Sequence, residues 1–368
     1  MRESIRYFIQ IYELRKLLIG MRAAIFEKVK EPLRIVENYD SPNIKGVLGH
    51  VIIDITACGV CHTDIGFLDK GIPTGKSPPL ILGHEMSGVV KEISDDVTSF
   101  KQGDHVLIPA VISCGTCFYC RTGRENICSN QVFFGSNVDG GFAEQIMVPA
   151  KDIFHLPHEI PLEEGCIIAD AISTPYHAVK NRGQVKAGDW VVVIGCGGIG
   201  MNIVQNVRVA GGLAIAVDII PKKLEIAKKL GAVETICANQ MDDRGIVGAI
   251  RKITNGGADI AFEAIGNPAT FTQAFNSLRT GGRLVAVGYS PKRWDGFDIG
   301  RVMFREMELV GSLGCRTVDY PKIIELVKNK NLVVKPLVTG KFPLNEINEG
   351  FNVMRRGEGV RTIILCNS

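Results

Sequence analysis

The chain has 368 residues, which predicts about two domains at ~150 residues per domain. Hydrophobic residues make up 46% and charged residues 22%, as in folded globular proteins, and this excludes a disordered or collagen-like chain. The formal net charge of +3 is too small to indicate nucleic acid or a membrane surface as a partner. No run reaches the ~18 apolar residues that a membrane span needs.

Residues 1–20 carry charges throughout, for example at Arg2, Glu13 and Lys16. A secretory signal needs an unbroken apolar core, so this segment is not predicted to be one. We expect an amphipathic helix or an N-terminal extension with no role in chemistry, and a protein of the cytoplasm.

Residues 21–171 are predicted to form a mostly β domain. Short strand-like runs at 51–60, 88–93, 104–111 and 144–149 are separated by turns rich in Gly, Pro and Asp. Long helical periods are few in this part of the chain, which favours sheet over helix.

Four of the 11 cysteines lie within fifteen residues, at Cys114, Cys117, Cys120 and Cys128. Random scatter would place only about half a cysteine in such a window. The spacing C-x2-C-x2-C-x7-C lets one loop surround a tetrahedral ion with Zn–S bonds of about 2.3 Å. Four thiolates complete the coordination sphere, so we expect a structural zinc that contributes folding free energy. An iron–sulfur cluster and unligated thiols remain as alternatives.

Residues 172–311 alternate strands and helices. We expect strands at 189–195, 213–218, 233–238, 258–266, 283–288 and 307–314, and one of the intervening helices at 269–282. Six strands with crossing helices predict a doubly wound parallel sheet, and therefore an α/β domain.

The first of these strands ends in GCGGIG, which opens the following helix. In this strand–turn–helix context the pattern is a strong signal for a dinucleotide. Gly195 would make the tight turn, Gly197 would let the pyrophosphate approach the backbone, and Gly200 would let helix and strand pack closely. The free N–H groups of the helix start would face the phosphates. The predicted cofactor-binding residues of the turn are Gly195, Gly197, Gly198, Ile199 and Gly200.

Asp218 ends the second strand, 23 residues after Gly195, where an acid can bind the ribose hydroxyls. A 2′-phosphate at ~4 Å from this carboxylate would be repelled by about 4 kcal/mol per unit charge at a dielectric constant near 20. The sequence therefore favours NAD over NADP, although Lys222 and Lys223 oppose this repulsion. Lys223 and Thr174 complete the predicted cofactor-binding set. The alternative for Asp218 is an ordinary acid at a strand end.

Residues 312–368 contain a helix and then the strand RTIILC. We expect this segment to pair back into the first domain and complete it. The nucleotide domain would then be inserted between two parts of the β domain.

Together the motifs CGVCHTD at Cys58–Asp64, GHE at Gly83–Glu85, the four-cysteine loop and GCGGIG resemble the zinc-dependent alcohol dehydrogenases of the medium-chain dehydrogenase/reductase superfamily. The resemblance covers about residues 21–368. It implies a GroES-like catalytic domain and a Rossmann domain, with hydride transfer from an alcohol to NAD. Residues 57–74, 106–111 and 168–180 also resemble hydroxycyclohexene-carbonyl-CoA dehydrogenases, so a cyclic or CoA-linked alcohol is one candidate substrate.

This resemblance implies a catalytic zinc with three protein ligands. They fall on Cys61, His84 and Asp170, and the last stands where the best-known members carry Cys. Glu85 matches an acid that lies close to the metal and exchanges with water or substrate. Two zinc ions per chain are expected, one catalytic and one structural.

The resemblance also implies a path for the substrate proton. Thr63 matches the hydroxyl that accepts this proton. Gly66 stands where many relatives carry a relay histidine, so the relay is expected to be shortened or to use water. His62 stands where relatives place a basic group, and it is expected either to bind the pyrophosphate or to complete the relay.

Two other functions are compatible with parts of the sequence. A zinc-free NADPH-dependent quinone or enoyl reductase of the same fold generally lacks the Cys/His pair and the four-cysteine loop. A zinc-ribbon protein that binds nucleic acid or protein is opposed by the near-neutral charge and the dinucleotide fingerprint. The expected partners are a small alcohol or carbonyl substrate and further copies of the chain. A homodimer or homotetramer would form through residues around 282–313.

Overall fold

The computed structural model describes residues 20–295 and 297–368, and the chain divides into two units. The first unit comprises the described residues up to Thr122 together with Cys128–Ala169 and Val338–Ser368. The second comprises Gly123–Ile127 and Asp170–Leu337. The helix expected in residues 1–20 lies outside the described residues, except for Gly20, which begins the first strand.

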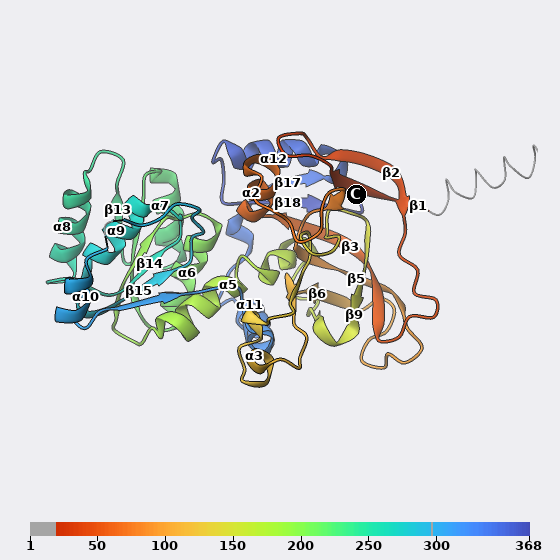
Figure 1. Cartoon of the computed structure of the whole chain (residues 1–368), viewed down its shortest axis with the longest axis horizontal. Coiled ribbons are helices and arrows are strands. Elements are labelled where there is room, and N and C mark those ends of the chain that lie inside the picture. The colour runs from red at the N-terminus through yellow and green to blue at the C-terminus, as the bar shows by residue number, and fades with distance from the viewer. Residues whose placement is uncertain (1–19, 296) are drawn as a thin grey trace, which may run out of the picture. The chain divides into compact units, whose positions relative to one another are not determined.

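The first unit is mostly β (Figure 1). A three-stranded sheet has the order β2 (Arg34–Asp40), β1 (Gly20–Phe26), β4 (Leu80–Ile81). A seven-stranded sheet has the order β10 (Phe154–His155), β6 (His105–Ile108), β5 (Glu85–Ile93), β3 (His50–Val60), β18 (Arg361–Leu365), β17 (Val338–Pro343), and β9 (Gln145–Pro149) also pairs with β3. The short strands β7 (Val111–Ile112) and β8 (Val132–Phe133) pair with each other. Its α-helices are α2 (His62–Lys70), α3 (Phe118–Arg121), α4 (Leu162–Gly165) and α12 (Ile347–Arg355), and its 3-10 helices are η2 (Ala150–Asp152), η3 (Cys166–Ala169) and η7 (Leu344–Glu346).

Strand β3 is the centre of the larger sheet, since it pairs with β5 on one side and β18 on the other. Cys58 of β3 lies opposite both Met86 and Ile364, and all three side chains are buried. The C-terminal strand therefore completes the sheet that the first part of the chain begins. This pairing brings the first residues of β18 next to the residues that follow β3.

The second unit contains a six-stranded parallel sheet among its described residues (Figure 1). Its strands have the order β13 (Glu234–Cys237), β12 (Leu213–Asp218), β11 (Trp190–Ile194), β14 (Ala258–Glu263), β15 (Leu278–Ala286), β16 (Glu308–Gly311). Its α-helices are α5 (Ser173–His177), α6 (Gly198–Val209), α7 (Pro221–Leu230), α8 (Asp243–Ile253), α9 (Pro268–Asn276), α10 (Ile299–Phe304) and α11 (Tyr320–Lys328). It also contains the π-helix η4 (Ala178–Gly183) and the 3-10 helices η1 (Glu125–Ile127), η5 (Thr317–Asp319) and η6 (Lys335–Leu337). The strand order reverses between β11 and β14, as in doubly wound folds. The predicted fold class, a GroES-like β domain plus a Rossmann domain, is confirmed.

One element of this sheet differs from the prediction. The helix expected over 269–282 ends at Asn276, and strand β15 begins at Leu278, five residues before the expected start. The hydroxyl of Ser277 donates to the carbonyl of Gln273 at 2.7 Å, so this residue closes the helix. Gly281 has a φ of +72°, which a helix does not accommodate.

The unit boundaries also differ from the expected positions, because residues 312–337 belong with the nucleotide unit. Two side chains of α6 explain this placement. The amide of Gln205 donates to the carbonyl of Val333 at 3.1 Å and accepts from its N–H at 2.8 Å. The guanidinium of Arg208 donates to the carbonyl of Asn331.

Within residues 20–295 and 297–368, every helix falls short of the length and apolar character that spanning a membrane requires.

Candidate metal centres and nucleotide site

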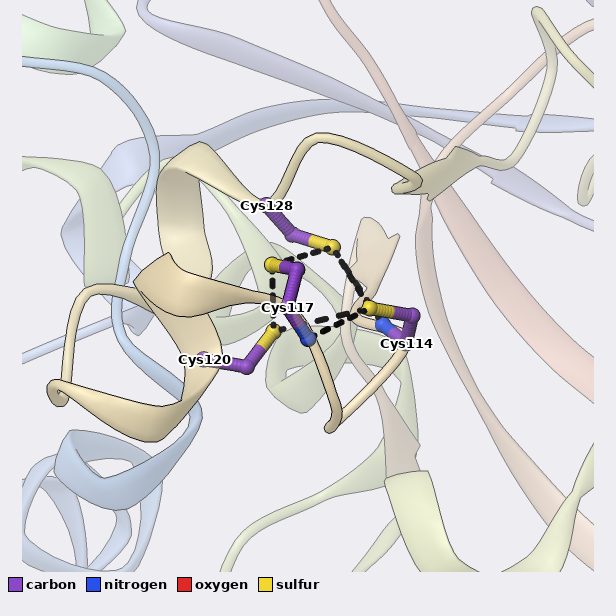
Figure 2. A group of neighbouring side chains, drawn as sticks. All are labelled: Cys114, Cys117, Cys120 and Cys128. Carbon is purple, nitrogen blue, oxygen red and sulfur yellow. Dashed lines mark hydrogen bonds between the residues drawn. The ribbon is translucent and has the colours of Figure 1, made fainter.

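The four clustered cysteines converge on one point (Figure 2). The Sγ atom of Cys114 lies 3.9 Å from that of Cys120 and 3.4 Å from that of Cys128. The Sγ atom of Cys117 lies 3.5 Å from that of Cys120 and 3.8 Å from that of Cys128. Zn–S bonds of about 2.3 Å in a tetrahedron require sulfur atoms about 3.8 Å apart. The four sulfur atoms therefore fit a zinc ion with only small adjustments.

Backbone N–H groups of the loop favour thiolates at this site. The N–H of Cys117 donates to the Sγ of Cys114 at 3.4 Å, and that of Asn130 donates to the Sγ of Cys128 at 3.3 Å. Hydrogen bonds from Thr116 and from the backbone lower the pKa of Cys114 to about 5. Desolvation raises the pKa of Cys120 to about 11. A bound cation would offset this last effect, because a coordinated thiol loses its proton.

A second group of ligand atoms comes from residues far apart in the sequence. One atom each of Cys61, His84, Glu85 and Asp170 lies within 4.8 Å of the others. The first three belong to the first unit, and Asp170 directly follows Ala169, the last residue of η3. A thiol, an imidazole and carboxylates are the donors that zinc accepts. The residues expected to hold a catalytic zinc are thus brought together.

Helix α2 and its cap place the first two of these ligands. Cys61 is the N-cap residue, and its N–H donates to Oδ2 of Asp64 at 2.9 Å. The other oxygen of Asp64 accepts from the N–H of Gly83 at 3.2 Å and lies 3.6 Å from Nδ1 of His84. Asp64 is fully buried, so one carboxylate links the segments that carry Cys61 and His84.

Glu85, the third member of this group in chain order, is the first residue of β5 and pairs with Arg361, the first residue of β18. Both side chains are buried, and Arg361 also donates to the carbonyl of Val60 at 3.3 Å. A Cβ at Gly59 would lie 2.1 Å from Oε2 of Glu85. Because Gly59 of β3 has no side chain, the carboxylate of Glu85 has the space that it occupies.

Thr174 was expected at the cofactor, and the structure places its hydroxyl on Asp170. It donates to Oδ1 of Asp170 across one turn of helix, and the backbone N–H of Thr174 also donates to the carbonyl of Asp170 at 2.9 Å. A ligand carboxylate that is itself hydrogen-bonded is held in one orientation.

The residues expected in the proton relay lie at the start of α2. The Sγ of Cys61 lies 3.6 Å from the hydroxyl oxygen of Thr63, and His62 is exposed. A Cβ at Gly66 would lie 2.8 Å from Cδ1 of Ile72. A side chain at this position would therefore require Ile72 to shift.

Three glycines of the turn differ in backbone angle and in the space around them. Gly195 has a φ of +94°, and a Cβ at Gly200 would lie 1.7 Å from the carbonyl oxygen of Gly195. A Cβ at Gly197 would meet nothing within 4 Å, so this face of the turn is open. Gly197 is the N-cap of α6, and Gly198 and Ile199 are in its first turn, where N–H groups have no partner within the helix. The turn thus offers an anion an open approach to a helix N-terminus.

Asp218 lies beside this turn. Its carboxylate accepts from the N–H of Cys196 at 2.7 Å and from the N–H of Ile220 at 2.9 Å. Lys223 follows within the first turn of α7 and is partly exposed. The acid is therefore fixed by two backbone donors at the end of β12.

Comparison with known proteins bears on both sites. Residues 48–158 match the alcohol dehydrogenase GroES-like domain, and residues 198–329 match the zinc-binding dehydrogenase family. The chain is 35% identical to an alcohol dehydrogenase of Geobacillus stearothermophilus over 92% of this chain and 97% of that enzyme. It is 33% identical to the class-3 alcohol dehydrogenase of Drosophila melanogaster, over 94% and 98% of the two chains. The solved alcohol dehydrogenase TADH from Thermus sp. ATN1 superposes with a TM-score of 0.86 at 29% identity, covering 94% and 99%.

The chain belongs to the zinc-dependent alcohol dehydrogenases of the medium-chain dehydrogenase/reductase superfamily. The resemblance drawn from the motifs is confirmed. Zinc and a nicotinamide cofactor are the groups that belong to this family, and the donor sets of the two clusters fit zinc. The individual ligand and cofactor roles of the predicted residues stay predictions.

Two residues that contact this group, Asp64 and Arg361, were not predicted from the sequence. Asp64 carries a usable signal, because it lies three residues after the N-cap Cys61, where an acid often closes a capping box. Arg361 carries none, since it is 276 residues from Glu85 and nothing near it in sequence indicates an ion pair.

Proposed function

We propose that the chain oxidises a primary or secondary alcohol to an aldehyde or ketone, with hydride transfer to NAD. The observation that carries this proposal is the group formed by the buried residues Cys61, His84 and Glu85 and the partly buried Asp170, in a chain that also holds an open glycine turn. A zinc-free reductase of the same fold has no use for such a donor set. The four-cysteine loop alone would suit a zinc ribbon, but it does not account for the second group.

Cys61, His84 and Asp170 would hold the catalytic zinc and leave one position for substrate. Zinc bound there supplies a Lewis acid that lowers the pKa of an alcohol hydroxyl. A bound nicotinamide would supply the hydride acceptor for the hydrogen of the alcohol carbon, and the hydroxyl proton would leave separately. Glu85 is proposed to exchange with water or substrate at the metal, while Arg361 balances its buried charge.

Thr63 is proposed to accept the substrate proton. Its hydroxyl lies beside the thiol of Cys61, so it is placed next to the proposed ligand group. Since Gly66 offers no side chain, the proton would continue to solvent through water or through the exposed His62. The other role proposed for His62 is binding of the pyrophosphate.

NAD is the proposed cofactor, and Asp218 is the reason. Its carboxylate lies beside the glycine turn, where it can accept from ribose hydroxyls and repel a 2′-phosphate. Measuring kcat/KM with NAD and NADP tests this preference. A higher value with NADP would overturn it.

Two zinc ions per chain are proposed, and two variants separate their roles. Cys61→Ser should remove one zinc per chain and abolish turnover with little change in thermal melting. Cys117→Ser should remove the other zinc and lower the melting temperature, because a structural zinc contributes folding free energy. Inductively coupled plasma mass spectrometry counts the metal. Full alcohol oxidation by Cys61→Ser would refute the zinc-dependent mechanism.

The substrate is proposed to be an alcohol, with a cyclic or CoA-linked alcohol as the finer candidate. Primary alcohols, cyclohexanol and hydroxyacyl-CoA esters form a panel that distinguishes these classes. The candidate is supported if kcat/KM is highest for the cyclic or CoA-linked members. It falls if primary alcohols are preferred.

A further inference from the structure

Glu263 is a buried carboxylate in the nucleotide unit. It is not one of the residues proposed above to bind a metal or the cofactor. It is the last residue of β14, and its exposed fraction is 0%. Its Oε1 accepts from the N–H of Ile265 at 3.1 Å, the N–H of Gly266 at 2.9 Å and the hydroxyl of Thr270 at 2.7 Å. Burial raises the pKa of Glu263, while these donors act in the opposite direction. The side chain therefore fixes the loop that follows its own strand.

The same residue reaches the loop that follows the neighbouring strand β15. Its carbonyl accepts from the N–H groups of Val287 at 3.0 Å and Gly288 at 2.9 Å. A Cβ at Gly288 would lie 2.2 Å from the nitrogen of Gly266 and 2.7 Å from Oε2 of Glu263. A Cβ at Gly266, whose φ is +82°, would lie 1.9 Å from the carbonyl oxygen of Tyr289. The two loops thus touch backbone to backbone around this one carboxylate.

These loops lie at the carboxyl ends of the strands, the side of the sheet on which doubly wound folds bind dinucleotides. The sheet order reverses between β11 and β14, and ligands of doubly wound sheets bind beyond the carboxyl ends of the strands at this point. A Cβ at Gly195 would lie 2.4 Å from Cγ1 of Ile265, so the loop after β14 packs directly on the glycine turn. The Ile265 side chain is nevertheless 51% exposed. An apolar side chain held open beside the turn is suited to contact a bound cofactor.

We propose that Glu263 is a positioning residue for the half of the dinucleotide that carries the nicotinamide. The half-sheet β11–β13 carries the glycine turn and Asp218, and the half-sheet β14–β16 is left for the second mononucleotide. By holding both loops of the second half, Glu263 sets the surface on which that mononucleotide lies. The inference rests on the proposed function only in requiring a nicotinamide dinucleotide as cofactor.

The test compares a whole dinucleotide with its adenosine half. We expect Glu263→Gln to raise the Kd for NADH about tenfold, or about 1.4 kcal/mol, because an amide group then faces N–H donors. The Kd for AMP should change less than about twofold, since AMP uses only the first half of the sheet. In alcohol oxidation the KM for NAD should rise while kcat falls less. Isothermal titration calorimetry measures both binding constants.

Asp259→Asn is a matched control on the same strand. Asp259 lies at the amino end of β14, accepts from the N–H of Trp190 at 2.7 Å and pairs with Arg279 at 2.6 Å. Like Glu263, it accepts from a backbone N–H group, but its donor belongs to β11 and lies at the amino ends of the strands. This variant should lower the melting temperature without changing the Kd of NADH or of AMP.

The outcomes separate the inference from the proposed function. Unchanged NADH binding by Glu263→Gln, or an equal loss for NADH and AMP, overturns the positioning role alone. If the unaltered chain bound neither NADH nor NADPH, the proposed function would fall with it. Should Glu263→Gln not fold, Thr270→Val removes one of the three donors and should raise the Kd of NADH two- to fivefold, at about 0.4–1 kcal/mol.

Discussion

Asp64 shows how one buried side chain can set the geometry of two proposed metal ligands. It accepts from the backbone of Cys61 and of Gly83, and it lies 3.6 Å from the ring of His84. The ring of His84 also packs on Phe133, with centroids 4.9 Å apart. Carboxylates behind a ligand histidine fix its tautomer and orientation.

Replacing this carboxylate by an amide tests the idea. Asp64→Asn should weaken zinc retention and lower kcat/KM by about 10- to 100-fold, because an amide group would face the N–H of Cys61 or of Gly83. Zinc content after dialysis against a chelator and steady-state kinetics measure the two effects. Asp69→Asn is the control, since Asp69 is on the same helix but pairs with Arg355 at the surface. Equal losses in both variants would contradict the role of Asp64.

We expect His177 to make the stability of the folded chain depend on pH. Its ring is 4% exposed, and Nδ1 lies 3.1 Å from the amide nitrogen of Asn181. Burial and the nearby Arg316 lower its pKa from 6.5 to about 4. The unfolded chain therefore binds this proton more strongly, and its contribution to stability is complete above pH 6.5 and lost as the pH falls toward 4.

The expected loss over this window is roughly 3 kcal/mol at most. Melting temperatures measured from pH 7 to pH 4 should fall less steeply for His177→Gln than for the unaltered chain. Parallel slopes for His177→Gln and the unaltered chain would show that the ring does not titrate as described.

At the scale of elements, the contact between helix α6 and the glycine turn leaves no room for a methyl group. A Cβ at Gly200 would meet the carbonyl oxygen of Gly195 at 1.7 Å, and backbone cannot move aside as a flexible side chain does. Gly200→Ala should therefore destabilise the chain by about 1–3 kcal/mol. It should also weaken NADH binding, because the helix start is displaced.

Gly248 offers a matched control for this substitution. It lies within helix α8, and a Cβ there would meet nothing within 4 Å. Gly248→Ala should stabilise the chain by about 0.5–1 kcal/mol, the usual gain of alanine over glycine inside a helix. Chemical denaturation compares both variants. Similar stability changes of the same sign would contradict the steric argument.

At the scale of the whole molecule, we propose that copies of the chain associate through the end of the parallel sheet. Strand β16 is last in the sheet order, and Leu309 on it is 45% exposed. Helix α10 precedes it and exposes Ile299, Met303 and Phe304, at 73%, 63% and 81%. Open strand edges beside apolar side chains are usually covered in stable proteins. A second copy related by a twofold axis would cover both the open edge of β16 and the exposed side chains of α10.

A charge on this edge tests the association. Leu309→Lys should shift the mass measured by light scattering from dimer or tetramer toward monomer, since a lysine on an edge strand opposes pairing. Val233→Lys, at a position 41% exposed just before β13 at the other end of the sheet, should leave the mass as it was. A monomeric unaltered chain would contradict the proposal.

The sequence by itself was sufficient for features whose parts are close together in the chain. The alternation of strands and helices indicated the parallel sheet, and the cysteine spacing predicted a single cluster whose sulfur atoms meet (Figure 2). Local periodicity and short spacings encode such features because only a few backbone angles separate the residues involved. The end of helix α9 was misplaced, since Ser277 and Gly281 stop it earlier than the apolar pattern indicated.

The tertiary structure decided what lies next to what over long separations. The group of Cys61, His84 and Asp170 was expected only through a family resemblance, and Asp64 and Arg361 behind it were not expected at all. The role of Glu263 depends on two loops that meet only when β14 and β15 pair. A local sequence pattern does not predict such contacts, because they form only when strand pairing brings distant segments together. The free energy of burial that drives this step depends on the apolar area that the whole fold removes from water, so it cannot be assigned to one short segment.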